Sequence, residues 1–262
     1  MSSKQTQLTS YFRTKPGQNK PTPIKNRIRN INKLAESLAT KLHSKPVYIT
    51  EDGSSWYILV KRWLLPKSQK DFDIEWNLHP SSRRQVQIFG KSLYERRWSQ
   101  AWGVSMVYSG LEQKAKAIKD STIVPTLLIK INDLMEGMPL DEIDCDASDV
   151  NQKLLYNACL QNWYEPNDSM GLHSDDESYI RHRFPIFSLS WGGTRRFLFR
   201  SKSKGSSKQG ESERVELWLE DGDLLVMGGL CQNTHKHEVP KLRSTMDPPT
   251  SNRINWTIRP LK

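Results

Sequence analysis

The chain has 262 residues, of which 36% are hydrophobic, and it carries a formal net charge of +10. This length suffices for one domain of about 200 residues with a tail. No apolar run approaches the ~18 residues that span a bilayer, and no apolar stretch follows the N-terminus, so we expect a soluble intracellular protein without a membrane anchor. Three cysteines without a C-x-x-C pair exclude a disulfide framework and a zinc ribbon: Cys145, Cys159 and Cys231.

The positive charge is concentrated in the first 50 residues, which hold ten Lys or Arg residues and a single acid, Glu36. A basic segment that is rich in Pro, Asn, Ser and Thr and poor in aromatic residues buries too little surface to fold alone. It is also attracted to polyanions such as nucleic acids. We therefore predict a disordered arm over residues 1–45, with a merely solubilising tail as the alternative.

Within this arm, the segment QTQLTSYF over residues 5–12 places three apolar residues at helical spacing. Leu8, Tyr11 and Phe12 would form a small plug for a groove on a partner if the segment made one helical turn. Together with Gln5 they resemble the PIP box, by which replication and repair proteins bind the sliding clamp PCNA. This resemblance implies a place at replicating DNA in the nucleus, where we expect the protein to act as a monomer.

Folded structure is predicted from Pro46 onward, and residues 46–120 are expected to form an N-terminal extension of the core. The segment VYITEDGSSWYILVKRWL indicates two strands around a turn at Asp52-Gly53. A short helix is expected to begin near Ser68 and to end before Pro80.

A second helix is predicted in VPTLLIKINDLMEGM, where Pro125 suits a first helical turn. Its apolar residues share one face and indicate a core contact: Leu127, Leu128, Ile131, Leu134 and Met135. The acidic stretch 133–149 holds no Lys or Arg, and we expect it to be a solvated connection.

From Leu155 onward the hydrophobic pattern has period two, in short segments separated by Gly, Pro and Asp. Five segments read as successive strands: PIFSLSW, RRFLFR, RVELWLE, DLLVMGG and RINWTIR. Many short antiparallel strands after a helical beginning predict an α+β fold, in which a double-stranded β-helix, or jelly roll, over residues 121–262 carries flanking helices.

The stretch GLHSDDESYI combines a histidine with three acids, although an isolated His-x-Asp is ordinarily a solvated loop. On a strand His173 and Asp175 share a face. His235 and His237 follow a later strand, and either could supply a third ligand. Two histidines and one carboxylate on a barrel wall form the facial triad of non-haem Fe(II) oxygenases. A zinc site that uses Cys231 is the alternative, but it lacks a second nearby thiolate.

The last predicted strand has one wholly polar face, and the same period-two rule pairs Asn162 with Tyr164 on an earlier strand. The polar face holds four residues: Arg253, Asn255, Thr257 and Arg259. In solvent this face would be an ordinary exposed ladder. Inside a barrel it would need an anionic guest such as a small dicarboxylate, because buried arginine must be paired.

Five segments, taken together and in order, resemble the AlkB family of Fe(II)- and 2-oxoglutarate-dependent nucleic-acid dealkylases over roughly residues 84–260: NWYEPNDSMGLHSDDE, PIFSLSWGGTRRFLFR, GDLLVMGG, QNTHKHEVP and NRINWTIR. The resemblance implies that Fe(II) is bound by His173, Asp175 and His237. It implies that 2-oxoglutarate is held by Asn162, Tyr164, Arg253, Asn255, Thr257 and Arg259. O2 is the other cosubstrate, and succinate, CO2 and formaldehyde are the implied products of demethylation.

The segment VQIFGK over residues 86–91 resembles the wedge of the family branch that repairs double-stranded DNA. This implies repair of 1-methyladenine and 3-methylcytosine in bases flipped out of the duplex, with residues 46–120 including a nucleotide-recognition lid. As a bare sequence feature, Phe89 could equally be a core residue. The resemblance implies that Phe89, flanked by Gly90 and Lys91, is the wedge, and that Lys91 and Arg97 contact phosphates. It implies that Tyr108 covers the flipped base, and Met106 stands where relatives carry an aromatic residue. Asp176 and Glu177 are the acids implied to contact the base.

Three other functions fit parts of this pattern. An RNA or single-strand demethylase would share the chemistry, and a PCNA-binding adaptor would retain the barrel without turnover. A protein hydroxylase is disfavoured by the basic arm and the wedge-like segment.

Overall fold

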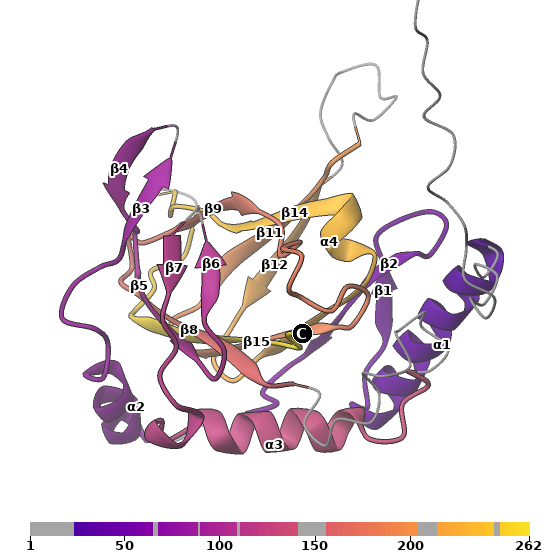
Figure 1. The fold of residues 1–262 in the computed structure, drawn as a ribbon, viewed down its shortest axis with the longest axis horizontal. Helices are drawn as coiled ribbons and strands as arrows, with labels where there is room; N and C mark the ends of the chain where they lie inside the picture. Colours follow the sequence, from indigo (N-terminus) through magenta and orange to yellow (C-terminus); the bar gives the residue numbers. More distant parts are fainter. Residues whose placement is uncertain are drawn as a thin grey trace, which may run out of the picture.

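Two antiparallel sheets dominate this computed structural model, which describes residues 24–64, 68–88, 90–108, 111–140, 156–203, 214–243 and 247–262. Figure 1 shows the sheets facing each other with the helices outside them. This arrangement is mostly β with few helices and is consistent with the predicted jelly roll. Within the described ranges, no helix is long and apolar enough to cross a membrane.

The larger sheet has seven strands in the order β1-β2-β13-β10-β15-β8-β5. Their bounds, in the same order, are Pro46–Tyr48, Ser55–Val60, Leu224–Gly229, Ile186–Gly192, Arg253–Arg259, Ala158–Tyr164 and Trp98–Trp102. The smaller sheet has the order β12-β11-β14-β9, with bounds Arg214–Leu219, Arg195–Ser201, His235–Val239 and Met170–His173. The five strand segments predicted after Leu155 are confirmed as β10, β11, β12, β13 and β15.

Two small hairpins stand beside the sheets at one end of the molecule (Figure 1). The first joins β3 and β4, and the second joins β6 and β7; the bounds are Gln85–Ile88, Lys91–Tyr94, Met106–Tyr108 and Leu111–Gln113. Gly90 in the first turn has a φ of 73°, a left-handed conformation that glycine adopts without a steric penalty.

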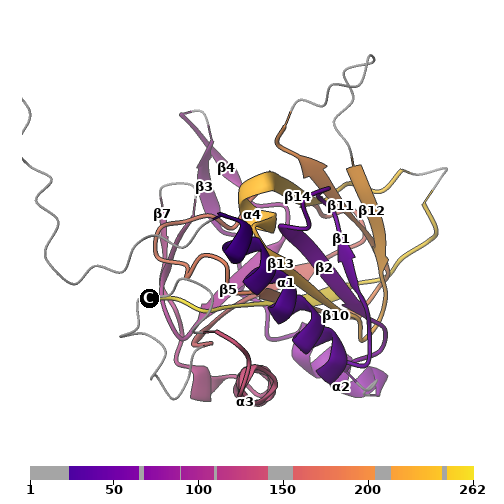
Figure 2. The ribbon, with the colours of Figure 1, turned by 90° about the vertical axis from the view of Figure 1, so that its right-hand side faces the viewer.

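Helices cover the outer face of the larger sheet (Figures 1 and 2). Ser68 caps α2 through a capping box with Asp71, so the predicted start of this helix is confirmed. The second predicted helix is also confirmed, and most of its apolar stripe is buried. The bounds are Ile24–Lys41 for α1, Gln69–Trp76 for α2, Val124–Met135 for α3 and Cys231–Thr234 for α4, with a 3-10 turn at Ile118–Asp120.

Strand β15 separates two environments through its alternating side chains. Ile254, Trp256 and Ile258 pack with the helices in the main core cluster. The four polar residues on the other face lie against side chains of the smaller sheet, including Phe197. The polar face therefore lies between the sheets, in the position that requires an anionic guest.

The disordered arm predicted over residues 1–45 is wrong for Ile24–Lys41, which form helix α1. Four apolar residues of α1 and the turn after it are buried against the larger sheet: Ile31, Leu34, Leu38 and Leu42. Their spacing of three or four residues is that of an amphipathic helix. The prediction of disorder rested on the net charge and composition of the whole N-terminal segment and did not take this spacing into account. The PIP-like segment 5–12 lies outside the described residues, as do Cys145 and most of the acidic connection.

The replacement Leu38→Ala tests whether α1 belongs to the folded core. Leu38 is 0% exposed, so we expect the free energy of unfolding to fall by about 2–5 kcal/mol in denaturant titrations. The exposed residue Arg29 on the same helix provides a control, and Arg29→Ala is expected to change stability by less than about 0.5 kcal/mol. Equal stability of the two variants would contradict a core role for α1.

Candidate active site

Strands β9 and β14 bring together residues that lie more than sixty positions apart. They pair antiparallel, and His173 stands directly opposite His237 in the register. Asp175 follows two residues after the end of β9 and is buried. The backbone pairing therefore places both imidazoles and the carboxylate at one edge of the smaller sheet.

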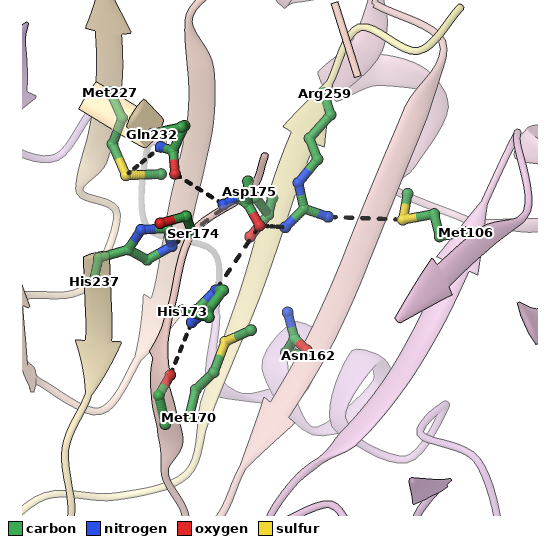
Figure 3. Close-up of polar contacts among 12 residues, drawn as sticks. Met106, Asn162, Met170, His173, Ser174, Asp175, Met227, Gln232, His237 and Arg259 are labelled. Atoms are coloured by element: carbon green, nitrogen blue, oxygen red, sulfur yellow. Dashed lines mark hydrogen bonds and ion pairs between the residues drawn. The ribbon is translucent and has the colours of Figure 1, made fainter. Parts of the chain in front are cut away.

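These three side chains form a cluster whose donor atoms all lie within 4.8 Å of one another. The Nε2 atom of His173 is 3.8 Å from Oδ1 of Asp175, and Nε2 of His237 is 4.0 Å from Oδ2. Figure 3 shows the three groups converging from two strands. This is the spacing of a donor set around one metal ion, and two nitrogens with one oxygen suit a divalent transition metal.

Protonation also favours metal binding. The Nδ1 atom of His173 lies 2.8 Å from the carbonyl oxygen of Gly171, so Nδ1 carries the proton and Nε2 keeps its lone pair for a metal. Burial lowers the pKa of His173, and burial together with the His173 ring lowers the pKa of His237 to about 3. Burial favours protonation of Asp175, but Arg259 and both histidines lower its pKa to about 2. Two neutral imidazoles and an ionised carboxylate result.

Two neighbours hold Asp175 in place. Its backbone N–H donates to Oε1 of Gln232 at 2.9 Å, and Nη2 of Arg259 donates to its Oδ1 at 2.7 Å (Figure 3). The Oδ2 atom is buried and has no hydrogen-bond partner among the residues that the structure describes. An ionised oxygen in this state is costly unless a cation binds it, so the cluster fits a metal ion.

The polar face of β15 continues the site away from the metal cluster. Arg253 is 1% exposed; its Nη2 donates to Oγ of Ser190, and its guanidinium lies 5.3 Å from the ring centroid of Tyr164. Its Nε and Nη1 atoms have no hydrogen-bond partner within the described ranges. Burial lowers the pKa of Arg253 to about 10. A buried guanidinium with two unused donors fits a carboxylate guest.

The remaining residues predicted to hold 2-oxoglutarate are buried. Tyr164, Asn255 and Thr257 line this pocket, whereas Asn162 lies outside its lining. Asn255 donates to Ser188 and to the Leu189 carbonyl, and Thr257 donates to Asn255. Asn162 accepts a hydrogen bond from Nε of Arg97 at 2.7 Å. All six residues predicted to hold the small acid therefore lie on β8 and β15, which are hydrogen-bonded neighbours in the larger sheet.

A second pocket adjoins the metal cluster, because Asp175 lines it, and Arg259 lines both this pocket and the first one. Met106 lies in its wall, where its sulfur accepts from Nη1 of Arg259 at 3.7 Å (Figure 3). Glu177 also lines this pocket, and burial and the nearby Asp175 raise its pKa.

Two predicted substrate contacts need correction. Asp176 is exposed and pairs with Lys202 at 3.2 Å, so it lies outside the pocket that Glu177 lines. Arg97 is buried against Asn162 and Glu95 instead of lying on the surface, so it does not suit a phosphate contact. The alternation that puts His173 and Asp175 on one face places Asp176 on the opposite face, so its outward position agrees with the period-two rule.

The hairpin residues Gly90 and Lys91 are exposed, as a nucleic-acid contact requires. Phe89 lies outside the described residues, and Tyr108 is described only as the end of β6. The predicted wedge and aromatic cover therefore stay predictions.

The alternative metal ligands do not join the cluster. His235 lies two residues before His237, but its Nδ1 is 2.8 Å from the hydroxyl of Thr234, and it is absent from the one metal-binding group found in the described part of the chain. Cys231 is also outside that group, and burial raises the pKa of its thiol to about 12. A protonated thiol is a poor zinc ligand, so the zinc alternative is not supported.

Sequence reasoning missed several residues that shape the site. Ser188 and Ser190 alternate with Phe187 and Leu189 in β10, and the period-two rule could have placed both hydroxyls on the polar face. Gln232 gave no such signal, because its contact to Asp175 depends on how α4 packs.

Comparison with known proteins agrees with this geometry. The sequence profile described as the 2OG-Fe(II) oxygenase superfamily matches residues 59–259. The chain belongs to this superfamily. Fe(II) is accordingly the ion for the histidine and aspartate cluster, and 2-oxoglutarate and O2 are the cosubstrates.

Individual relatives point to one part of the superfamily. The chain is 37% identical to the alpha-ketoglutarate-dependent dioxygenase alkB homolog 3 of Mus musculus over 112 residues, which cover 42% of this chain and 38% of that protein. It is 34% identical to the DNA oxidative demethylase ALKBH2 of Homo sapiens over 180 residues, 67% of this chain and 60% of that protein. The match thus spans less than two thirds of either relative. The solved structure of OsALKBH1 superposes with a TM-score of 0.44 at 21% identity, covering 82% of this chain and 99% of that chain.

The metal assignment is tested by comparing two histidines of the same strand. We expect His237→Ala to abolish saturable Fe(II) binding in anaerobic calorimetry, because it removes one of three ligands. His235→Ala is expected to retain binding, since His235 lies outside the cluster. Loss of binding in His235→Ala alone would overturn the assignment.

The cosubstrate pocket is tested by Arg253→Lys, which keeps the charge and removes the planar fork. We expect the dissociation constant for 2-oxoglutarate to rise at least about tenfold, because a bidentate contact is lost. Affinity for Fe(II) should stay unchanged, because Arg253 is not a metal ligand. The control is Arg214→Lys at an exposed position, and calorimetry under nitrogen measures both ligands.

Proposed function

We propose that this superfamily member is an oxidative DNA demethylase that repairs 1-methyladenine and 3-methylcytosine. The observation that carries the proposal is the second pocket, which is lined by the metal ligand Asp175 and shares Arg259 with the first pocket. A methylated base bound there would present its N-methyl group beside the metal. The proposal is supported by the similarity to a relative named as a DNA oxidative demethylase.

The protein contributes positioning, and the bound iron with 2-oxoglutarate and O2 supplies the oxidising chemistry. His173, His237 and Asp175 hold the metal. Arg253 orients the carboxylate of 2-oxoglutarate that is remote from the metal, because Arg259 is already paired with Asp175. In the net reaction, one oxygen atom of O2 enters succinate and the other enters the methyl group. The hydroxymethyl group then leaves as formaldehyde, its hydroxyl proton passes to water, and the ring nitrogen regains its lone pair, while the 2-oxoglutarate carboxylate that is lost leaves as CO2.

Access to the base requires its extrusion from the helix, which costs a few kcal/mol and least for a base that pairs poorly. The two hairpins beside the pocket suit contacts to the nucleic acid, and Phe89, which lies in the sequence between β3 and β4, is proposed as the wedge that fills the vacated stack. Exposed Lys91 is proposed as a phosphate contact. Tyr108 is proposed to cover the flipped base.

Tethering to the replication clamp belongs to the same proposal. Gln5, Leu8, Tyr11 and Phe12 form the PIP-like motif, and the basic residues after it suit a segment near DNA. A monomer held by PCNA in the nucleus would meet methylated bases as they are exposed during replication.

The function is tested by formaldehyde and succinate release from three oligonucleotides of one sequence that carry 1-methyladenine: duplex DNA, single-stranded DNA and RNA. We expect turnover on duplex DNA by the iron-loaded protein and none by Asp175→Ala, which lacks a metal ligand. Turnover confined to single strands or RNA would favour the rival demethylase. Release of neither product from any substrate would favour a clamp-binding adaptor.

A further inference from the structure

Two carboxylates in the second pocket have no part in metal or cosubstrate binding. Glu95 lies between β4 and β5, and Glu177 lies in the loop after β9. Both line the pocket together with Asp175 and Arg259, so a group bound near these carboxylates is also near the metal cluster. Glu95 is buried and Glu177 is half-buried beside the metal cluster, and a carboxylate in such a place needs partners.

Glu95 is held firmly but is not saturated. It is 6% exposed, and its Oε2 accepts from Oγ of Ser99 at 2.8 Å while its Oε1 accepts from Nη2 of Arg97 at 3.4 Å. An ionised carboxylate has about four acceptor positions. The described residues therefore leave acceptor capacity on Glu95 for a ligand in the pocket.

Two nearby arginines, Arg84 and Arg97, form ion pairs with Oε1 of Glu95 at 3.8 Å and 3.4 Å. Arg97 directs its shorter bond, 2.7 Å, to Asn162. Arg84 keeps its Nη1 at 3.8 Å from Glu95 and donates from Nη2 to the carbonyl of Leu111. Arg259 is paired with Asp175.

We propose that Glu95, together with Glu177, selects bases that carry a positive charge and an exocyclic amino group. This inference rests on the proposed demethylase function and names the residue that sets its base preference. Methylation of cytosine at N3 produces a cation whose 4-amino group donates hydrogen bonds, and both features suit a carboxylate. In 3-methylthymine the ring is neutral and a carbonyl oxygen replaces the amino group, so its lone pairs would face the carboxylate. The two bases share the methylated N3, which makes them a matched pair.

The experiment compares single-stranded oligonucleotides that differ only in this base. Single strands remove the cost of extrusion from the comparison. For the wild type we expect kcat/KM to favour 3-methylcytosine over 3-methylthymine. Glu95→Gln keeps the shape and removes the charge, and we expect it to lower this preference at least about tenfold, since a charged hydrogen bond is lost. The ratio of the two affinities, measured without iron or oxygen, is expected to fall in parallel.

Three further variants separate charge selection from a structural role. Glu112→Gln removes an exposed carboxylate of β7, and Ser99→Ala removes the donor to Glu95 while its charge remains; both should keep the preference within about twofold. Glu95→Asp withdraws the charge by one methylene and is expected to give an intermediate preference. It also serves as the deciding variant if Glu95→Gln does not fold.

The outcomes distinguish the inference from the function on which it rests. If the wild type releases formaldehyde from neither oligonucleotide, the proposed function fails. If the wild type is active but Glu95→Gln and Glu95→Asp keep its preference, or lose activity equally on both bases, Glu95 does not select the base and the inference is overturned.

Discussion

The buried ion pair between Arg259 and Asp175 is the contact on which the other parts of the site depend. This 2.7 Å contact joins β15 of the larger sheet to the metal-binding edge of the smaller sheet. Removing such a pair from water costs several kcal/mol per ion, so it persists only with good geometry and further partners. Gln232 and the two histidine rings provide those partners for Asp175. Since the pair lines both pockets, the metal cluster, the cosubstrate pocket and the second pocket meet at one pair of charges.

A second buried cation, Arg97, links residues on two neighbouring parts of the site. Arg97 donates to Asn162 on β8 and to Glu95 in the wall of the second pocket. Its guanidinium fork has donors in several directions, so it can hold both residues at once, which a lysine could not do with the same geometry. The wall of the second pocket is therefore tied to the sheet that carries the cosubstrate pocket.

The sequence predicted what depends on local periodicity and did not predict what depends on packing. Alternation was sufficient to place Arg253 and Arg259 on one face, whereas the resemblance implied that this face points inward and distinguished His237 from His235. Helix α1 was missed because charge averaged over the whole N-terminal segment outweighed the spacing of Leu34 and Leu38. Glu95 could not be foreseen as a pocket residue, because its burial depends on how the link between β4 and β5 docks, and register across a sheet is a long-range property.

The unsatisfied groups of the site connect ligand binding to the stability of the fold. Oδ2 of Asp175 and Nη1 of Arg253 are buried without hydrogen-bond partners among the described residues, and each such atom costs about 1–3 kcal/mol. The apolar clusters on the outer face of the larger sheet and beside the polar face offset this cost and keep the polar interior in place. A metal ion and a carboxylate guest that bind only the folded chain would pair with these atoms and remove that cost. At a hundred times its dissociation constant, such a ligand adds about 2.7 kcal/mol of stability. The folded chain therefore reaches its full stability only when the metal ion and the carboxylate guest are bound between the sheets.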